Sequence, residues 1–185
     1  MKKLSILLKG IIKENPVLVL VLTIICIVIS AALAVTNMIT EPIIEETEAR
    51  NAEAARREVM PEADGFELVE ADGLPETVTE VYRATNGVGY VFMLTCDGYG
   101  GKDTLNLICG IDSDGLIVAT KVLSHSETAG LGSKVADEPF ESQFVGKDAS
   151  LEGVEAISGA SRSSGYYING IKDAFTAFEI VKGAE

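Results

Sequence analysis

Basic residues are scarce in this chain of 185 residues, which has 15 Lys and Arg against 28 Asp and Glu and a net charge of −13. A protein that binds the phosphate backbone of nucleic acid needs a basic surface to displace counterions, so this composition argues against a nucleic-acid partner. Hydrophobic residues make up 47% of the sequence, which argues against a disordered chain. Apolar and acidic residues must therefore be concentrated in different parts of the chain.

Cysteine and histidine are also rare, with three and one in the chain. No CxxC or CxxH spacing occurs, so the sequence does not predict a zinc or iron–sulfur site. Cys96 and Cys109 flank a glycine-rich turn; they could form a disulfide across a hairpin or remain two buried thiols, whereas Cys26 lies in an apolar run as a packing residue. His125 has no visible nucleophile beside it, which argues against hydrolase chemistry, and we assign it no proton-transfer role.

A long uncharged segment occupies residues 17–35 and would span roughly 28 Å as a helix, close to the thickness of a bilayer core. The 16 residues before it carry four Lys and one Glu, about +3, whereas residues 41–185 carry 11 basic and 27 acidic residues, or −16. The positive-inside rule then predicts a single-pass protein of the cell membrane, with a cytoplasmic N-terminus and an extracytoplasmic C-terminal domain.

A cleaved signal peptide is the alternative for this segment, because Ala-Leu-Ala at 32–34 fits a cleavage site. Signal peptides have apolar cores of about 7–15 residues, however, and the longer run here favours an uncleaved anchor. A buried core helix fits less well, since a domain of this size does not need a helix that is apolar all round. We divide the chain into a cytoplasmic N-terminus, a membrane helix, a helical stalk and a C-terminal domain, at 1–15, 16–40, 41–62 and 63–185.

The pattern after residue 40 predicts an α+β fold with an antiparallel sheet covered by helices. Residues 41–60 are rich in Glu, Ala and Arg and lack Gly, which predicts a helix with Pro42 in its first turn and Pro61 at its end. Short apolar runs separated by turn residues predict strands, with hairpin turns at Asn86-Gly87 and at 112–115. The predicted strand runs lie at 79–85, 89–94, 105–111 and 116–122. A short helix or turn is predicted at 139–145, and a C-terminal amphipathic helix is predicted after Ser161.

Two segments carry residues suited to a ligand site. Residues 124–132 combine a histidine, a glutamate, hydroxyls and two glycines after a predicted strand, although an irregular surface loop also explains them. Residues 155–161 place small and hydroxyl residues directly before the C-terminal helix, where free N–H groups and the helix dipole bind phosphate, and Arg162 could add a cation. A plain N-cap is the simpler explanation for a serine there.

These segments resemble the FMN-binding domain family of respiratory membrane complexes. The motif SGAS at 158–161 resembles the family's S/T-G-A-T/S flavinylation motif, and residues 125–132 resemble its H-x-E-T-P-G-L-G segment. Further similar stretches lie at 98–101, 110–115, 143–147 and 40–43, so the resemblance covers essentially the whole chain. Within the family, the chain is most similar to the G subunits (RnfG) of Rnf complexes, which are ion-translocating ferredoxin:NAD oxidoreductases. The C subunit (NqrC) of the sodium-translocating NADH:quinone reductase is similar but typically longer.

The resemblance implies a redox subunit that relays electrons through FMN, whose phosphate is esterified to Ser161, where Thr is more usual. It implies three kinds of partner: membrane lipid, the other Rnf complex subunits (A, B, C, D and E), and a flavin transferase that matures the protein. The residues expected to bind the cofactor are Ser158, Gly159, Ala160, Ser161, Arg162, Ser163, Glu127, Thr128, Gly130 and Leu131.

Two departures from the family pattern are Glu155 in place of Asp and Ala129 in place of Pro. The longer carboxylate must be tolerated by the transferase, and the alanine loosens the loop backbone without removing a functional side chain. Other functions remain open: a different membrane-anchored FMN electron-transfer protein, or a non-redox anchored interaction module. A lipoprotein is disfavoured because no lipobox cysteine follows the apolar segment.

Overall fold

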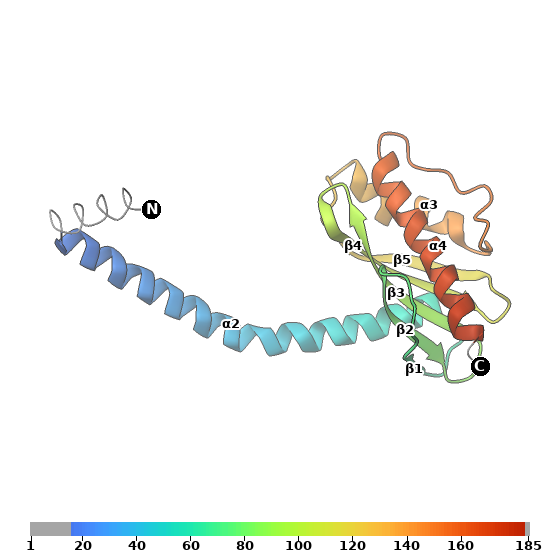
Figure 1. The fold of residues 1–185 in the computed structure, drawn as a ribbon, viewed down its shortest axis with the longest axis horizontal. Helices are drawn as coiled ribbons and strands as arrows, with labels where there is room; N and C mark the ends of the chain where they lie inside the picture. Colours follow the sequence, from blue (N-terminus) through green and yellow to red (C-terminus); the bar gives the residue numbers. More distant parts are fainter. Residues whose placement is uncertain (1–15, 184–185) are drawn as a thin grey trace. The chain divides into compact units, whose positions relative to one another are not determined.

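The computed structural model describes residues 16–183, and the chain divides into two compact units between Arg50 and Asn51 (Figure 1). The elements in chain order are α2 (Pro16–Val59), β1 (Phe66–Val69), β2 (Val78–Ala84), β3 (Gly89–Gly98), β4 (Gly101–Asp112), β5 (Ile117–His125), η1 (Gly132–Ala136), α3 (Glu138–Glu141), η2 (Ser142–Phe144) and α4 (Ser161–Gly183).

Helix α2 joins two segments for which the sequence predicts separate membrane and stalk helices. The helix continues without a break through residue 40 and ends two residues before Pro61. A proline inside a helix removes one backbone hydrogen bond, and here the helical backbone continues past Pro42, so Pro42 does not start a new helix. Within α2, the segment Val19–Glu41 has a mean hydropathy of 2.9 and is long and apolar enough to cross a membrane.

The five strands form one antiparallel sheet in the order β1-β2-β3-β4-β5, so every strand pairs with its neighbour in the chain. The predicted turn at 112–115 closes the β4–β5 hairpin, where the Asp112 carboxylate accepts hydrogen bonds from the N–H groups of Asp114 and Leu116. Strands β3, β4 and β5 are longer than their apolar runs, because polar residues at their ends also pair. The fold is α+β, as the sequence predicts.

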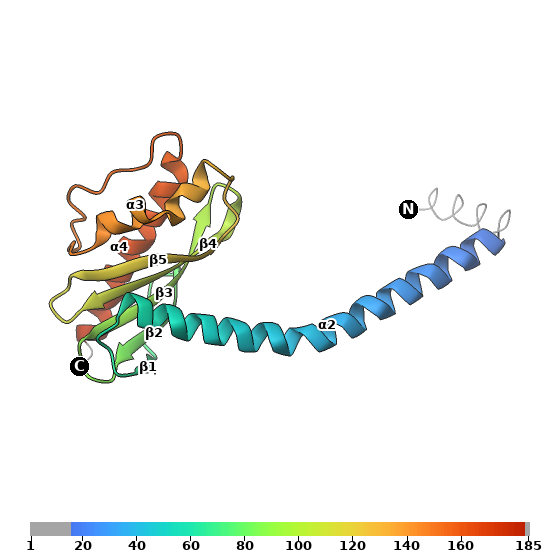
Figure 2. The ribbon, with the colours of Figure 1, turned by 180° about the vertical axis from the view of Figure 1, so that it is seen from behind.

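Both faces of the sheet are covered, and alternate residues of the central strands point to opposite faces. Phe92 and Leu107 pack with the apolar face of α4, which runs across one side of the sheet (Figure 1). Val91 and Ile108 point the other way and pack with Ala55 and other residues at the end of α2, on the side seen in Figure 2. Helix α4 is thereby held against the sheet along its length, and its N-terminus is fixed in place.

The two cysteines of the sheet are buried free thiols, so the disulfide considered from the sequence does not form. The strand register pairs Cys96 with Leu105 and Cys109 with Phe92, which separates the two sulfur atoms along the ladder. Burial raises the pKa of the Cys96 thiol to about 12 and also raises the pKa of Cys109, so both are neutral at physiological pH. Neutral buried thiols are inert packing groups.

Candidate functional site

The loop after β5 and the start of α4 lie together through a buried carboxylate. Glu127 is 8% exposed, and its Oε2 accepts a hydrogen bond of 2.6 Å from the hydroxyl of Ser163. Its Oε1 accepts a bond of 2.8 Å from the N–H of Tyr99 at the turn between β3 and β4. One side chain thus connects three segments that are distant in the sequence.

A cavity of about 250 Å³ lies at this junction, and we call it the Ser161 cavity. Its lining residues are Tyr99, Glu127, Thr128, Leu131, Gly132, Gly159, Ala160, Ser161, Arg162 and Ser163. Eight of these belong to the ten residues that the sequence predicts for cofactor binding. Ser158 and Gly130 lie nearby in the chain but do not line the cavity, whereas Tyr99 and Gly132 line it without having been predicted.

The signal for the two additional lining residues was present in the sequence but ambiguous. Tyr99 lies in the glycine-rich turn at 98–101, and Gly132 ends the segment 124–132. Gly130 has a φ of +75°, as a glycine in such a loop permits, whereas Gly132 allows a close approach to the Glu127 side chain. Only the tertiary structure shows which glycine is needed for a positive φ and which is needed for space beside another side chain.

The first turn of α4 presents backbone donors to the cavity. The N–H groups of Ser161, Arg162 and Ser163 have no hydrogen-bond acceptor among the residues that the structure describes, as is usual for the first turn of a helix. The aligned peptide dipoles of this helix of 23 residues add a partial positive charge at the same end. This end of α4 therefore suits an anion such as a phosphate.

The serines of this region have different environments. The Ser164 hydroxyl is buried; it accepts from the Ile157 N–H and donates to the Ala160 carbonyl, which anchors the preceding turn to α4. The Ser163 hydroxyl is committed to Glu127. Ser158 and Ser161 are exposed, and among the residues that the structure describes the side chain of neither bonds to a backbone N–H at the start of α4, so neither acts as an N-cap. Among these four serines, Ser161 is the one that combines an uncommitted hydroxyl with a place in the cavity wall.

Arg162 provides a cation at the same helix end. Its guanidinium carbon lies 6.0 Å from the ring centroid of Tyr99 and 5.8 Å from that of Tyr166. Its Nη2 donates a long hydrogen bond of 3.4 Å to the Tyr166 hydroxyl. The aromatic rings thus hold Arg162 without neutralising its charge, which leaves that charge available to an anion.

The remaining residues singled out from the sequence lie outside the cavity wall. His125 is exposed at the end of β5, and its Nδ1 accepts a hydrogen bond of 3.3 Å from the Glu127 N–H. Ala129 and Glu155 are exposed, and the Glu155 N–H donates to the Gln143 side chain. Within residues 16–183, no group of three or more His, Cys, Asp or Glu side chains could hold a metal ion.

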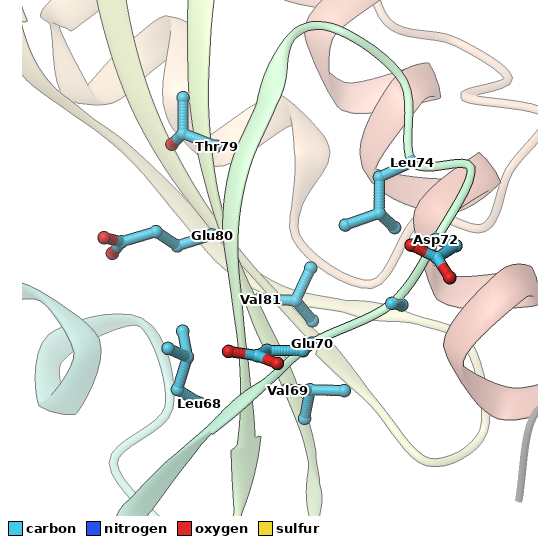
Figure 3. Close-up of a pocket in the computed structure, with 9 residues that line it drawn as sticks. Leu68, Val69, Glu70, Asp72, Leu74, Thr79, Glu80 and Val81 are labelled. Atoms are coloured by element: carbon cyan, nitrogen blue, oxygen red, sulfur yellow. The ribbon is translucent and has the colours of Figure 1, made fainter.

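A larger hollow of about 590 Å³ lies beside β1 and β2, and Figure 3 shows its labelled side chains. The carboxylates of Glu70, Asp72 and Glu80 belong to its wall, which has no basic side chain. Like charges repel, so this surface disfavours a phosphate. The Ser161 cavity is smaller and has one carboxylate, Glu127, in its wall, but the Arg162 guanidinium and the free N–H groups at the start of α4 suit an anionic ligand.

Fold and site together define a class of protein: an α+β domain preceded by an apolar helix, with an anion-binding helix N-terminus beside a small cavity. A model of the FMN-binding domain matches residues 98–176, which span β4, β5, the intervening loops and most of α4. The chain is 35% identical to the G subunit of the Na(+)-translocating ferredoxin:NAD(+) oxidoreductase complex of Acetobacterium woodii, over 82% of this chain and 79% of that protein.

Two further relatives extend this similarity. The G subunit of the ion-translocating oxidoreductase complex of Methanosarcina acetivorans is 31% identical over 88% of this chain and 93% of its own length. The G subunit of the proton-translocating ferredoxin:NAD(+) oxidoreductase complex of Clostridium ljungdahlii is 26% identical over 83% and 85%. The chain therefore belongs to the RnfG family, the G subunits of ion-translocating oxidoreductase complexes, with an FMN-binding domain.

Proposed function

We propose that this protein is the redox-active G subunit of a membrane-bound, ion-translocating ferredoxin:NAD oxidoreductase and carries FMN esterified to Ser161. The observation that carries the proposal is the uncommitted Ser161 hydroxyl, which lies among free backbone N–H groups in the wall of a cavity inside the FMN-binding domain. The RnfG relatives align with most of this chain and over most of their own length, which supports this assignment over the related NqrC proteins.

The residues present fit a flavin phosphate. In the proposed linkage the Ser161 Oγ–H bond and one P–OH bond of the flavin phosphate break, an Oγ–P ester bond forms, and the elements of water leave, so the product is heavier by one FMN less one water. The N–H groups of the first turn and the Arg162 guanidinium would hold the phosphate oxygens. When bound, the flavin supplies the redox chemistry, and the protein supplies position and electrostatics.

The size of the cavity bears on electron transfer. Pockets that enclose a small molecule typically measure roughly 300–1,000 Å³, and the Ser161 cavity measures about 250 Å³. It would therefore enclose only part of a flavin and leave the rest accessible to a neighbouring redox centre. A covalent bond then retains the cofactor, which a shallow site alone would hold weakly.

The proposal includes the surroundings of the protein. The apolar span in α2 would anchor it in lipid with the N-terminus in the cytoplasm, and the FMN-binding domain would lie on the other side of the membrane. The other Rnf complex subunits (A, B, C, D and E) would be its partners, and a flavin transferase would attach the FMN. No independent catalysis is expected of the isolated protein.

Flavin attachment is tested by expressing the full chain together with a flavin transferase. The wild type should show flavin fluorescence on a denaturing gel and an intact mass raised by FMN less water. Ser161→Ala should lose both signals, because no hydroxyl remains to form the ester, and Ser161→Thr should retain them.

Thr176→Ala is the matched control, since this exposed hydroxyl residue lies on the same helix but outside the motif and the cavity wall. It should retain the flavin. A wild-type chain without flavin would refute the proposal, and if it still assembled with its partner subunits it would support a non-redox interaction module. Retention of flavin by Ser161→Ala would refute the attachment site.

A further inference from the structure

Within the part of the chain that the structure describes, the buried Glu127 carboxylate interacts only with neutral donors. Both of its oxygens accept hydrogen bonds, from the Tyr99 N–H and the Ser163 hydroxyl, which is the pattern of an ionised carboxylate. No ion pair of Glu127 occurs within residues 16–183. A buried charge without a cation is costly, so a purely structural hydrogen-bonding role would be filled at lower cost by a neutral amide.

The surrounding chain is shaped to this side chain. A Cβ atom added at Gly98 would collide with Oε1, and one added at Gly132 would collide with Oε2. Two glycines from different segments therefore leave the space that the carboxylate occupies. The group is held in one position, with no room for another side chain at either flank.

The fixed charge lies in the wall of the Ser161 cavity. Its hydrogen-bond partner Ser163 is two residues from Ser161, on the first turn of the same helix. Charges interact strongly where water is excluded and protein dipoles cannot reorganise. A cofactor in this cavity would therefore experience the Glu127 charge much more than that of an exposed carboxylate.

We propose that Glu127 lowers the reduction potential of the flavin by holding a fixed negative charge beside it, an inference that rests on the proposed function. Reduction adds electrons to the flavin ring, and a nearby unpaired negative charge disfavours that addition. Glu127 acts as a positioning residue as well, because its two hydrogen bonds hold the β3–β4 turn and the start of α4 in place. The charge is the part of its role that geometry alone does not require.

Glu127→Gln separates the two roles. The amide is isosteric; its oxygen can accept from the Tyr99 N–H, and its NH₂ can donate to the Ser163 oxygen. In the full chain, with the attachment of FMN checked by intact mass, we expect a flavin midpoint potential that is more positive than that of the wild type. The expected shift is about tenfold in the one-electron equilibrium constant, equivalent to about 59 mV. Spectroelectrochemical titration measures it.

Glu152→Gln is the matched control, because it removes one carboxylate from an exposed position outside the cavity wall. Water and salt screen such a charge, so the potential should change far less. A Glu127→Gln potential no different from that of Glu152→Gln would overturn the inference while leaving the attachment of FMN intact. Absence of flavin from the wild type would instead refute the proposed function, and this inference with it.

Glu127→Asp keeps the charge on a shorter arm and covers a failure of the amide variant to load. A loaded Asp variant with a potential near the wild-type value, beside a loaded and shifted Gln variant, would support the inference. Loading by Asp but not by Gln would mean that the charge serves attachment rather than the potential. Failure of both variants to load would mean that Glu127 has a structural role in the site. Loading by Asp alone and loading by neither variant would each overturn the inference.

Discussion

Glu141 shows how a single carboxylate can make stability depend on pH. Its Oε1 accepts a 2.7 Å hydrogen bond from the Val122 N–H, which attaches α3 to β5. Desolvation by burial is the largest influence on its ionisation and raises the pKa of Glu141 above the ordinary value of 4.5, against the effects of the Val122 hydrogen bond and Lys121. The native state therefore favours the protonated form of this side chain more than the unfolded state does.

The corresponding prediction is that Glu141→Gln changes the pH dependence of unfolding. A raised native pKa stabilises the fold below pH 4.5, and that contribution is lost as the pH rises through the native pKa. The free energy of unfolding of Glu141→Gln should therefore rise relative to the wild type over this interval. The amide does not ionise, so it has no desolvated charge in the native state, and its oxygen can still accept from the Val122 N–H. Urea unfolding of the full chain in detergent at several pH values measures it.

Glu138→Gln, which removes an exposed carboxylate from the same helix, is the control for a general charge effect. A difference between Glu141→Gln and the wild type that falls or stays constant with rising pH would contradict the prediction.

Ser161 and Glu127 could be identified from motifs in the sequence. The use of Glu127 as a link between Tyr99 and Ser163 could not, because hydrogen-bond partners 28 and 36 residues away leave no local signal.

Among the elements, α4 approaches β3 closely at one glycine. A Cβ atom on Gly170 would collide with the Sγ of Cys96, so the helix and the sheet meet here without room for a methyl group. The helical spacing of apolar residues predicts α4 and its buried face correctly. It does not predict which strand lies under Gly170, because that depends on the order of strands in the sheet.

This contact predicts a coupled pair of substitutions. Gly170→Ala should destabilise the protein by up to about 2 kcal/mol, since overpacking costs about 1–3 kcal/mol and the better helix propensity of Ala returns about 1 kcal/mol. Adding Cys96→Ala should relieve the collision, so the double variant should be more stable than the sum of the single effects by about 1 kcal/mol. Chemical denaturation of the four proteins forms the cycle.

Gly165→Ala is the control on the same helix, because a Cβ there meets no other atom within 4 Å. It should leave stability unchanged or raise it by up to about 1 kcal/mol. Additive effects of Gly170→Ala and Cys96→Ala would show that the helix shifts to accommodate the methyl group. The prediction would then be wrong.

At the scale of the whole molecule, charge is divided on either side of the apolar span. The 16 residues before the uncharged run carry about +3 and residues 41–185 carry −16. A positive flank is retained in the cytoplasm. The domain with the Ser161 cavity should therefore be exported, and this orientation is a prediction of the sequence.

Protease added to intact spheroplasts tests this orientation. The C-terminal domain should be degraded without lysis, while a fragment with an intact N-terminus and the membrane segment should remain. Replacing Lys2, Lys3, Lys9 and Lys13 by Gln should increase the protected fraction, because the orientation signal is removed. Protection of the wild-type domain until lysis would contradict the predicted topology, and a missing N-terminus in the intact mass would indicate signal cleavage.

Properties encoded locally could be predicted from the sequence alone: the apolar span, the charge division, the hairpin turns and the C-terminal helix. Each depends on residue types within a few turns or one hairpin, so short-range patterns suffice. Two features could not be predicted in this way. The two predicted helices form one helix, α2, because the backbone continues through residue 40, and Cys96 is separated from Cys109 because of the strand register.

The Ser161 cavity itself was decided by the tertiary structure. The scarcity of basic residues argues against nucleic acid, yet it does not prevent the domain from having one site suited to a phosphate. That site consists of a helix end, one arginine and a clamped loop, which the sheet brings together from three parts of the chain. Its donors are mostly backbone groups, whose availability depends on where a helix begins rather than on which side chains the sequence contains.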